Sequence, residues 1–318
     1  MRKYNQLTQE QRYHTAALNK TGTSLTFIAE TVGVHKSTIS RELKRNAGMR
    51  GYHAKQANEL SLQRRKTAKK HIKMTINLKN KVKEKLLQDW SPDQISGYFK
   101  KNDGILISHE RIYQYVLEDK KSGGDLYKHL RHSAKKRKKR YGSHDRRGQI
   151  KNKVSIEDRP KIVDEKSRIG DWEIDTVIGK NHKGAFVTIV DRVSKFTIIA
   201  KVPTKHADGV TAATIKTLSL YAGVVHTITS DNGTEFAGHE EIAKQLNTQF
   251  YFAHPYSSWE RGVNENTNGL IRQYVKKGSS FDNLTNNTAK KIMSRLNNRP
   301  RKSLNYMTPN EFLYELTG

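Results

Sequence analysis

The stretch DWEIDTVIGKNHKGAFVTIVDRVSKFTIIAKV, residues 171–202, sets the fold of the second half of the chain. It contains three runs rich in β-branched and aromatic residues, DWEIDTVI, AFVTIVDR and FTIIAKV, with turn residues between them. Such runs predict β-strands. A helical stretch, ADGVTAATIKTLSLYAG, and a further strand, VVHTITSD, come next. Three strands, a helix and another strand predict a mixed α/β domain.

The composition predicts a protein that binds a polyanion. Lys and Arg number 59 against 31 Asp and Glu, a formal net charge of +28. Nucleic acid is the leading candidate, and an anionic membrane surface is the alternative. No signal-peptide core and no run of roughly 18 apolar residues is visible, so we expect a cytoplasmic protein, associated with DNA and without a membrane partner. The absence of cysteine excludes thiolate zinc sites, disulfides and thiol catalysis.

The pattern along the chain predicts five regions. Residues 131–153 hold eleven Lys or Arg and one acid, which predicts an extended basic linker that binds phosphates, with a plain solvated tether as the alternative. The regions are a helix-turn-helix domain at 1–50, a second helical domain of similar kind at 51–130, the basic linker at 131–165, the α/β domain at 166–280 and a C-terminal helical segment at 281–318. For the tail from Asn297 onward we expect structural packing, with DNA or subunit contacts as the alternative.

The stretch TSLTFIAETVGVHKSTISRELKR predicts a helix-turn-helix. Counted from Leu25 as the first position, Ala29, Gly33 and Ile39 fall at the fifth, ninth and fifteenth. They supply a small residue at the helix contact, a glycine at the turn and an apolar anchor for the second helix. The second helix presents donors that suit phosphates and base edges, namely Lys36, Ser37, Thr38, Arg41, Lys44 and Arg45. A helical hairpin with a solvated basic face is the alternative.

The stretch WSPDQISGYFKKNDGILISHERIYQYV, residues 90–116, predicts a second helical pair. Ser91 as N-cap, followed by Pro92, opens one helix, and Ser108 opens the next. On that second helix, His109, Arg111 and Gln114 are candidates for DNA contacts. The intervening loop is longer than in the first unit, and a packing role is the alternative.

The acids of DWEIDTVI share one face of the strand. A period of two puts Asp171, Glu173 and Asp175 on that face. An exposed polar face accounts for the first two. Asp175 differs, because Val177 follows it on the same face and a carboxylate among apolar neighbours is costly unless it is paired or metal-bound.

Asp231 ends the predicted strand in TITSDNGTEF, residues 227–236. The Asn-Gly pair after it is a strong hairpin signal. Asp231 is therefore either a turn residue or a carboxylate held at a strand end for chemistry.

A helix that starts near Ser258 carries three further candidates. Glu265, Asn268 and Arg272 share one of its faces. A carboxylate, an amide and a guanidinium together suit a metal ion and a phosphate. A solvated Glu and Arg one or two turns apart is the alternative.

Taken together, WEIDT, SDNGTEF and Glu265, with 33 residues between Asp231 and Glu265, resemble the DDE constellation of RNase H-like transposases and retroviral integrases. More narrowly, the chain resembles bacterial insertion-sequence transposases of the IS-thirty family in TISRELKRN, WSPDQISG, HPYSSWERGVNENTNGLIR and LNNRPRKSLNYMTPNEF. Ile174 stands where a small residue, often glycine, is expected. It lies on the strand face opposite the acids, so we expect a change in packing and not a loss of catalysis.

The resemblance implies an α/β fold class, in which an N-terminal helical helix-turn-helix region precedes an RNase H-like mixed-sheet catalytic core. It implies Asp175, Asp231 and Glu265 as catalytic residues and metal ligands for two Mg²⁺ ions, with Mn²⁺ able to substitute. We assign Arg272, and more weakly Asn268, to DNA binding beside the metals.

The implied activity is DNA transposition. The protein would bind the terminal inverted repeats of its element, cleave the DNA and join the freed 3′ end to target DNA, as a homodimer or higher assembly on the DNA ends. A metal-dependent DNA nuclease without joining and a catalytically inactive DNA-binding regulator are the alternatives.

Overall fold

A computed structural model describes residues 6–67, 74–131, 150–255 and 257–317. The chain divides into two compact units, Met1–Lys73 and Met74–Gly318. Most of the predicted basic linker, residues 132–149, lies outside the described residues. Among the described helices, none has the length and apolar character needed to cross a membrane.

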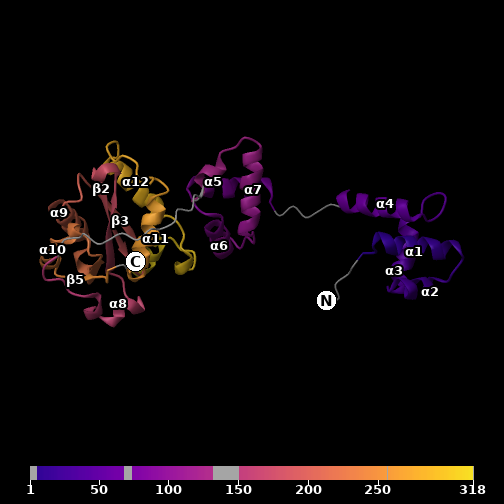
Figure 1. The fold of residues 1–318 in the computed structure, drawn as a ribbon, viewed down its shortest axis with the longest axis horizontal. Coiled ribbons are helices and arrows are strands. Elements are labelled where there is room, and N and C mark those ends of the chain that lie inside the picture. Colours follow the sequence, from indigo (N-terminus) through magenta and orange to yellow (C-terminus); the bar gives the residue numbers. More distant parts are fainter. Residues whose placement is uncertain (1–5, 68–73, 132–149, 256, 318) are drawn as a thin grey trace. The chain divides into compact units, whose positions relative to one another are not determined.

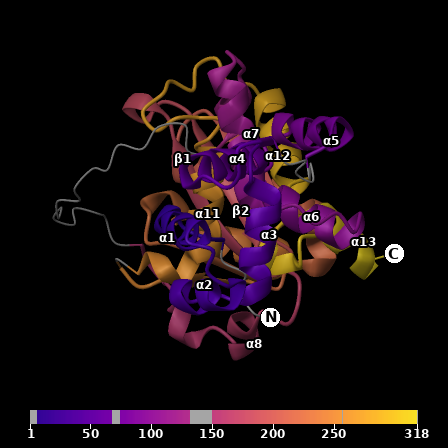
Figure 2. The ribbon, with the colours of Figure 1, turned by 90° about the vertical axis from the view of Figure 1, so that its right-hand side faces the viewer.

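The first unit is a helical bundle whose core confirms the predicted helix-turn-helix. Its helices are α1 (Gln9–Lys20), α2 (Leu25–Val32), α3 (Lys36–Asn46) and α4 (Ala54–Thr67). Gly33 ends α2 in the left-handed region with φ 73°, and α3 then crosses α2 (Figure 2). Ile28, Ala29 and Ile39 pack together in the buried core. The glycine lets the chain turn sharply enough for the two helices to share this core.

A buried arginine ties α4 into the first unit. Arg12 Nε donates to Glu42 of α3 at 2.8 Å, and its terminal nitrogens donate to Asn58 and Ser61 of α4 at 3.2 and 3.1 Å. Because α4 packs on α1 through these bonds, the first unit extends beyond the boundary predicted at residue 50.

The second unit begins with a helical subdomain, made of α5 (Ile76–Leu87), α6 (Pro92–Asn102) and α7 (His109–Lys121). Ser91 caps α6 in a capping box with Gln94, and Ser108 caps α7, as the sequence predicts. The core of the subdomain contains Val82, Leu86, Ile95, Phe99, Ile112 and Val116.

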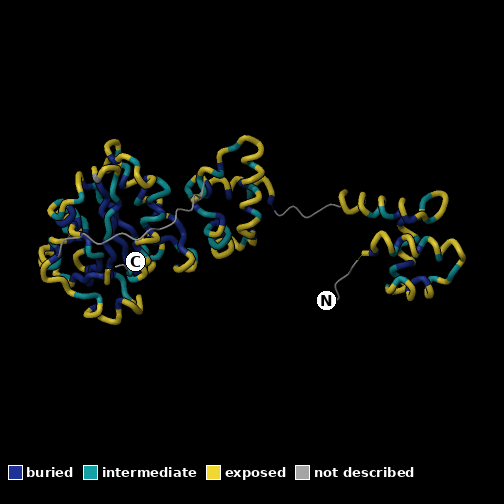
Figure 3. Tube along the Cα trace, in the orientation of Figure 1, coloured by how far each residue is buried: buried dark blue, intermediate teal, exposed yellow. Residues whose placement is uncertain are grey.

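A five-stranded sheet forms the centre of the α/β domain, which the sequence predicts to be the catalytic domain. Its strands are β1 (Asp171–Ile178), β2 (Ala185–Asp191), β3 (Thr197–Val202), β4 (Thr227–Ser230) and β5 (Gln249–Phe252). They lie in the order β3-β2-β1-β4-β5, with β1 to β3 antiparallel and with β4 and β5 parallel to β1. The strands are largely buried (Figure 3). The first four strands confirm the prediction, whereas β5 had no counterpart in it.

Helices cover both faces of the sheet. Helices α9 (Ala207–Leu218) and α10 (His239–Leu246) pack on one face, and α11 (Gly262–Ile271) and α12 (Asn286–Asn297) pack on the other (Figure 1). The remaining helices are α8 (Lys161–Glu165) and α13 (Pro309–Thr317), with short 3₁₀ turns at Leu126–His129, Ile156–Asp158, Lys180–His182, Ser219–Val224, Thr234–Phe236, Ser258–Arg261 and Lys302–Leu304. Ile174 is fully buried in the core beneath α9 and α10, which is the packing role expected for it.

The catalytic domain is larger than the sequence predicts. Ile150 is buried in the core under α9 and α10, and the N–H of Phe252 donates to the carbonyl of Val154. Residues 150–165 are part of this domain. The linker predicted at 131–165 therefore extends too far toward the C-terminus. At the other end, α12 covers β3, and the Asn297 side chain exchanges two hydrogen bonds with the Thr197 backbone at 2.8 and 2.9 Å. The helical C-terminal segment therefore belongs to the same domain.

Asp89 joins the helical subdomain to the catalytic domain. One carboxylate oxygen pairs with His129 Nδ1 at 2.8 Å, and the other accepts from the Tyr274 hydroxyl at 3.1 Å and lies 3.6 Å from Arg295. Farther along, Gln94 of α6 donates to the carbonyl of Pro300 at 2.8 Å. Side chains of both parts thus converge on one acid, which makes the subdomain a fixed part of the second unit.

We predict that Asp89→Ala lowers the unfolding free energy of the second unit by about 1–3 kcal/mol, because Tyr274 and His129 lose a common acceptor. Denaturant unfolding followed by tryptophan fluorescence measures it. All three tryptophans, Trp90, Trp172 and Trp259, lie in this unit. Asp93→Ala, at an exposed position of α6, is the matched control. Equal effects of the two substitutions would contradict the role of Asp89.

Candidate active site

Parallel pairing of β1 with β4 brings two predicted acids together. In this register Glu173 lies opposite Thr229. Two residues farther along the strands, Asp175 comes beside Asp231, which directly follows β4. The side chains of Asp175 and Asp231 are 23% and 33% exposed, so both are reached from solvent at one edge of the buried sheet.

Arg261 bridges the two aspartates. Its Nη1 lies 3.5 Å from Asp175 Oδ2, and its Nη2 lies 3.2 Å from Asp231 Oδ2. Nη1 also donates to the carbonyl of Ile174 at 3.3 Å, and the arginine side chain is only 10% exposed. Arg261 was not among the predicted site residues, although its position four residues before Glu265 at the start of a helix was a usable signal.

Asp175 is held in place by neighbours on β1, β2 and α11. The Asn268 amide donates to Asp175 Oδ2 at 3.0 Å, and the Thr188 hydroxyl donates to the Asn268 carbonyl oxygen at 2.9 Å. The backbone N–H of Thr176 donates to Asp175 Oδ1 at 2.7 Å. Burial raises the pKa of Asp175 to about 6, against the lowering effect of Arg261 and with a further raising effect of Asp231. Both polar atoms of the Asn268 amide are thus engaged with protein, which makes Asn268 a positioning residue for Asp175; the DNA contact expected for it stays a prediction.

Asp231 takes part in a local turn in the loop after β4, and it also presents one carboxylate oxygen to Arg261. Asp231 Oδ1 accepts from the N–H of Gly233 at 2.9 Å, which closes a local turn, while Oδ2 faces Arg261. The Asn-Gly pair does not make a hairpin, since β4 lies between β1 and β5 and runs parallel to both. Asn232 instead fixes the loop by donating to the carbonyl of Ala253 at 2.6 Å.

Glu265 lies on α11 near the two aspartates but apart from them. It follows Arg261 by four residues and precedes Asn268 by three, so it shares the helix flank from which both contact Asp175. Its side chain is exposed. Within the described part of the chain, no three His, Asp or Glu side chains come close enough to hold a metal ion. The structure therefore brings together two of the three predicted ligands.

Asp171 and Glu173 are structural acids and not the exposed face that the sequence suggested. Arg168 holds Asp171 with two hydrogen bonds of 3.0 and 3.1 Å. Glu173 pairs with Arg192 at 3.0 Å and accepts from the N–H of Asn264 at 2.8 Å. Both acids are 1% exposed, because α11 and the segment before β1 cover this strand face. Burial raises the pKa of Glu173, and Arg192 opposes that shift.

Glu235 is a further acid near the site that sequence reasoning missed. It is buried, accepts from the Thr176 hydroxyl at 2.9 Å and lies 3.8 Å from the Lys205 ammonium. The bond to Thr176 links the loop that carries Asp231 to the strand that carries Asp175. Its place in SDNGTEF, four residues after Asp231, was the available signal.

Arg272 lies at the C-terminal end of α11, farther from the acids. One terminal nitrogen donates to the carbonyl of Ile178 at 3.3 Å, and the other is buried without a partner among the described residues. Burial lowers the pKa of its guanidinium. The side chain lines a cavity with Thr176, Lys180 and Lys277, which is a basic setting beside the end of β1.

The predicted DNA-contacting residues of the helical parts lie largely at the surface. In α3, Lys36, Arg41, Lys44 and Arg45 are exposed, and Ser37 and Thr38 are half-buried. In α7, His109 and Gln114 are exposed, while Arg111 bonds Glu118 at 3.0 Å and Gln114 at 3.2 Å on its own helix. The α3 arginines and lysines are therefore freer to meet a ligand than Arg111.

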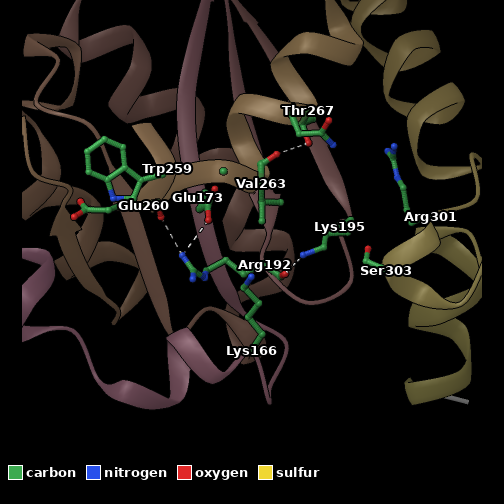
Figure 4. A pocket seen from close by; sticks show the side chains of 12 residues that line it. Lys166, Glu173, Arg192, Lys195, Trp259, Glu260, Val263, Thr267, Arg301 and Ser303 are labelled. Carbon is green, nitrogen blue, oxygen red and sulfur yellow. Dashed lines mark hydrogen bonds and ion pairs between the residues drawn. The ribbon is translucent and has the colours of Figure 1, made fainter. Parts of the chain in front are cut away.

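A cavity of about 260 Å³ lies on the flank of α11 opposite Glu265 (Figure 4). Its basic lining residues come from several segments, and Lys195 donates to the carbonyl of Arg192. Burial lowers the pKa of Lys195 to about 8 and that of Arg301 to about 9. The lining comprises Lys166, Glu173, Arg192, Lys195, Trp259, Glu260, Gly262, Val263, Asn266, Thr267, Arg301 and Ser303. Because Glu173 is committed to Arg192, the cavity has an excess of positive charge.

Two family models match the chain, one for each type of domain. Residues 166–258 match the integrase core domain, and residues 3–46 match a helix-turn-helix domain. Among solved structures, the HTLV-2 integrase catalytic core domain in complex with magnesium is 21% identical and covers 44% of this chain and 93% of its own, with a TM-score of 0.35.

Whole-length relatives are insertion-sequence transposases. The transposase for IS4351 of Bacteroides fragilis is 46% identical and covers 96% of this chain and 94% of that protein. The transposase for IS1086 of Cupriavidus metallidurans is 36% identical, with coverages of 99% and 96%. Transposase InsI for IS30A of Escherichia coli is 36% identical, with coverages of 91% and 78%. The chain belongs to this family of insertion-sequence transposases, DNA-binding polynucleotidyl transferases that join a helix-turn-helix domain to an integrase core.

Proposed function

We propose that this transposase cleaves and joins DNA at a metal-dependent site made by Asp175, Asp231 and Glu265. The observation that carries the proposal is the convergence of Asp175 and Asp231 on a single cationic group, Arg261, at 3.5 and 3.2 Å. Two carboxylates on neighbouring parts of the sheet that aim oxygens at one cation provide the charge arrangement a divalent ion needs. Glu265, exposed on the adjacent helix flank, is the third ligand in this proposal.

The donor set fits Mg²⁺, with Mn²⁺ as a substitute. Both ions take carboxylate oxygens, and Mg²⁺ completes its shell with water and substrate phosphate. Two such ions, when bound, would activate the attacking oxygen and stabilise the leaving oxygen of the phosphodiester.

Protein groups around the acids set their orientation. Asn268 and the N–H of Thr176 hold the Asp175 carboxylate, and the N–H of Gly233 holds that of Asp231. The two Oδ2 atoms both face Arg261, and a scissile phosphate would lie beside them. Preorganised ligands reduce the cost of bringing the acids together at the moment of reaction.

Removing the charge of Asp231 tests the catalytic role. We expect Asp231→Asn to lower DNA cleavage and joining at least about 100-fold, because several kcal/mol of charge stabilisation depend on its carboxylate. Asp175→Asn and Glu265→Gln should do the same. The purified chain is incubated with labelled element-end DNA and a target plasmid, in Mg²⁺ or in EDTA.

Glu241→Gln, at an exposed position of α10, is the control variant for this assay. Joined products should form with wild type and control in Mg²⁺ only. Cutting without joining by the wild type would identify a nuclease, and DNA binding without either reaction would identify a regulator.

We further propose that α3 reads the terminal inverted repeats of the element. Its exposed basic residues follow a glycine turn, which is the arrangement of a recognition helix that enters the major groove. The two ends of an element need two sites, so we propose at least a dimer on DNA. His109 and Gln114 of α7, exposed in the second unit, are candidates for a further DNA contact.

Arg41→Ala tests recognition by α3. We expect it to weaken binding to element-end DNA by about 1–3 kcal/mol if Arg41 contacts a base, with a smaller effect on unrelated DNA. Fluorescence anisotropy at fixed salt measures both affinities. Lys20→Ala, in the last turn of α1 and outside α3, is the control. An equal loss of affinity on both DNAs would assign Arg41 to the phosphate backbone.

The cavity beside α11 is a candidate contact for the DNA backbone, and the pKa of Lys195 makes this testable. Lys195 is charged below a pH of about 8 and neutral above it. Wild-type DNA affinity should therefore fall as pH rises through about 8, by up to about fivefold for one partly exposed charge pair. Lys195→Gln should remove that step. Anisotropy titrations from pH 7 to 8.5 measure it, and an unchanged step in the variant would exclude Lys195.

A further inference from the structure

Arg261 occupies the place between the two aspartates that a cation must fill. Asp175 lies within β1 beside Asp231, which directly follows β4, and without a cation their charges would repel each other. We propose that Arg261 is a built-in counter-ion, which holds the acids together while no metal is bound and is displaced when a divalent metal binds. This inference rests on the metal site proposed above.

The geometry shows which carboxylate oxygens are in competition. Asp175 Oδ1 accepts from the N–H of Thr176, and Asp231 Oδ1 accepts from the N–H of Gly233. Arg261 contacts the Oδ2 atoms of both acids, and Asp175 Oδ2 also accepts from the Asn268 amide at 3.0 Å. A metal ion that bridges the acids needs the same two oxygens. Arginine and metal therefore exclude each other from this position.

Arg261 is bound more weakly than the structural arginines nearby. Its distances of 3.5 and 3.2 Å exceed those of Arg168 to Asp171, at 3.0 and 3.1 Å, and of Arg192 to Glu173, at 3.0 Å. Charge-assisted hydrogen bonds are strongest at about 2.7–2.9 Å. An arginine with this set of contacts neutralises the acids without being locked to them.

The location of Arg261 allows it to leave without unfolding the helix. It ends the short 3₁₀ turn Ser258–Arg261, which precedes α11, and Trp259 in that turn is 75% exposed. Glu265 follows one helical turn later with its side chain in solvent. This arrangement places Arg261 inward and Glu265 outward. Metal binding would reverse the two, because the ion repels the guanidinium and attracts the carboxylate.

Metal-dependent thermal stability of the full chain without DNA tests the inference. Arg261→Gln should lower the melting temperature of the metal-free protein, because the aspartates lose their counter-ion. It should also lower the Mn²⁺ concentration at the midpoint of the stabilisation by about tenfold, equivalent to about 1.4 kcal/mol. Arg272→Gln is the matched control. It removes the same charge from the same helix flank, but Arg272 bonds to the carbonyl of Ile178 and not to the aspartates. It should leave the midpoint unchanged.

An unchanged or higher midpoint in Arg261→Gln, while wild type is stabilised by Mn²⁺, would overturn the counter-ion role and leave the metal site standing. Absence of any Mn²⁺ effect in both proteins would overturn the metal site as well. If Arg261→Gln does not fold, Arg261→Lys replaces it. One ammonium cannot bridge both acids as a planar guanidinium does. The Mn²⁺ midpoint of Arg261→Lys should therefore lie below the midpoint shared by wild type and Arg272→Gln, but by less than the tenfold expected for Arg261→Gln.

Discussion

The pairing of β1 with β4 is the constraint on which the active site depends. These strands come from segments separated by two further strands and a helix, and their parallel register sets Asp175 beside Asp231. A shift of one residue would turn one acid to the opposite face of the sheet. The register is specified by burial on both faces, since Ile174 packs under α9 and α10 while Val177 packs under α11 and α12.

Burial of charge then determines the roles of the acids on β1. Three carboxylates share one strand face, and the helix that covers this face makes each of them need a cation. Asp171 and Glu173 have close arginine partners and serve as structural pairs. Asp175, nearest the edge, shares the looser Arg261 with Asp231. The need to neutralise buried charge therefore gives two tight structural ion pairs, at Asp171 and Glu173. It also gives one looser site, between Asp175 and Asp231, that can exchange its cation.

Sequence reasoning was strongest where the signal is local. The helix-turn-helix was predictable because the roles of Ala29, Gly33 and Ile39 depend only on their spacing within one short segment. The helix caps at Ser91 and Ser108 were predictable because each acts within a single helical turn. It failed for β5, a four-residue strand whose burial comes from pairing with β4 and from packing in the core with α10. It also misjudged Asp171 and Glu173, because alternation shows which residues share a face but not what covers that face.

The sequence by itself determined the classes of domain, the basic surface for DNA and the family, since composition, helix caps and motif spacing are properties of the linear chain. Only the tertiary structure decided that Asp175 and Asp231 meet at Arg261, that Asn268 holds Asp175, and that Glu265 stays in solvent. These relations depend on the register between distant strands and on the placement of α11. Both are fixed by long-range packing of the whole domain, which local spacing does not encode.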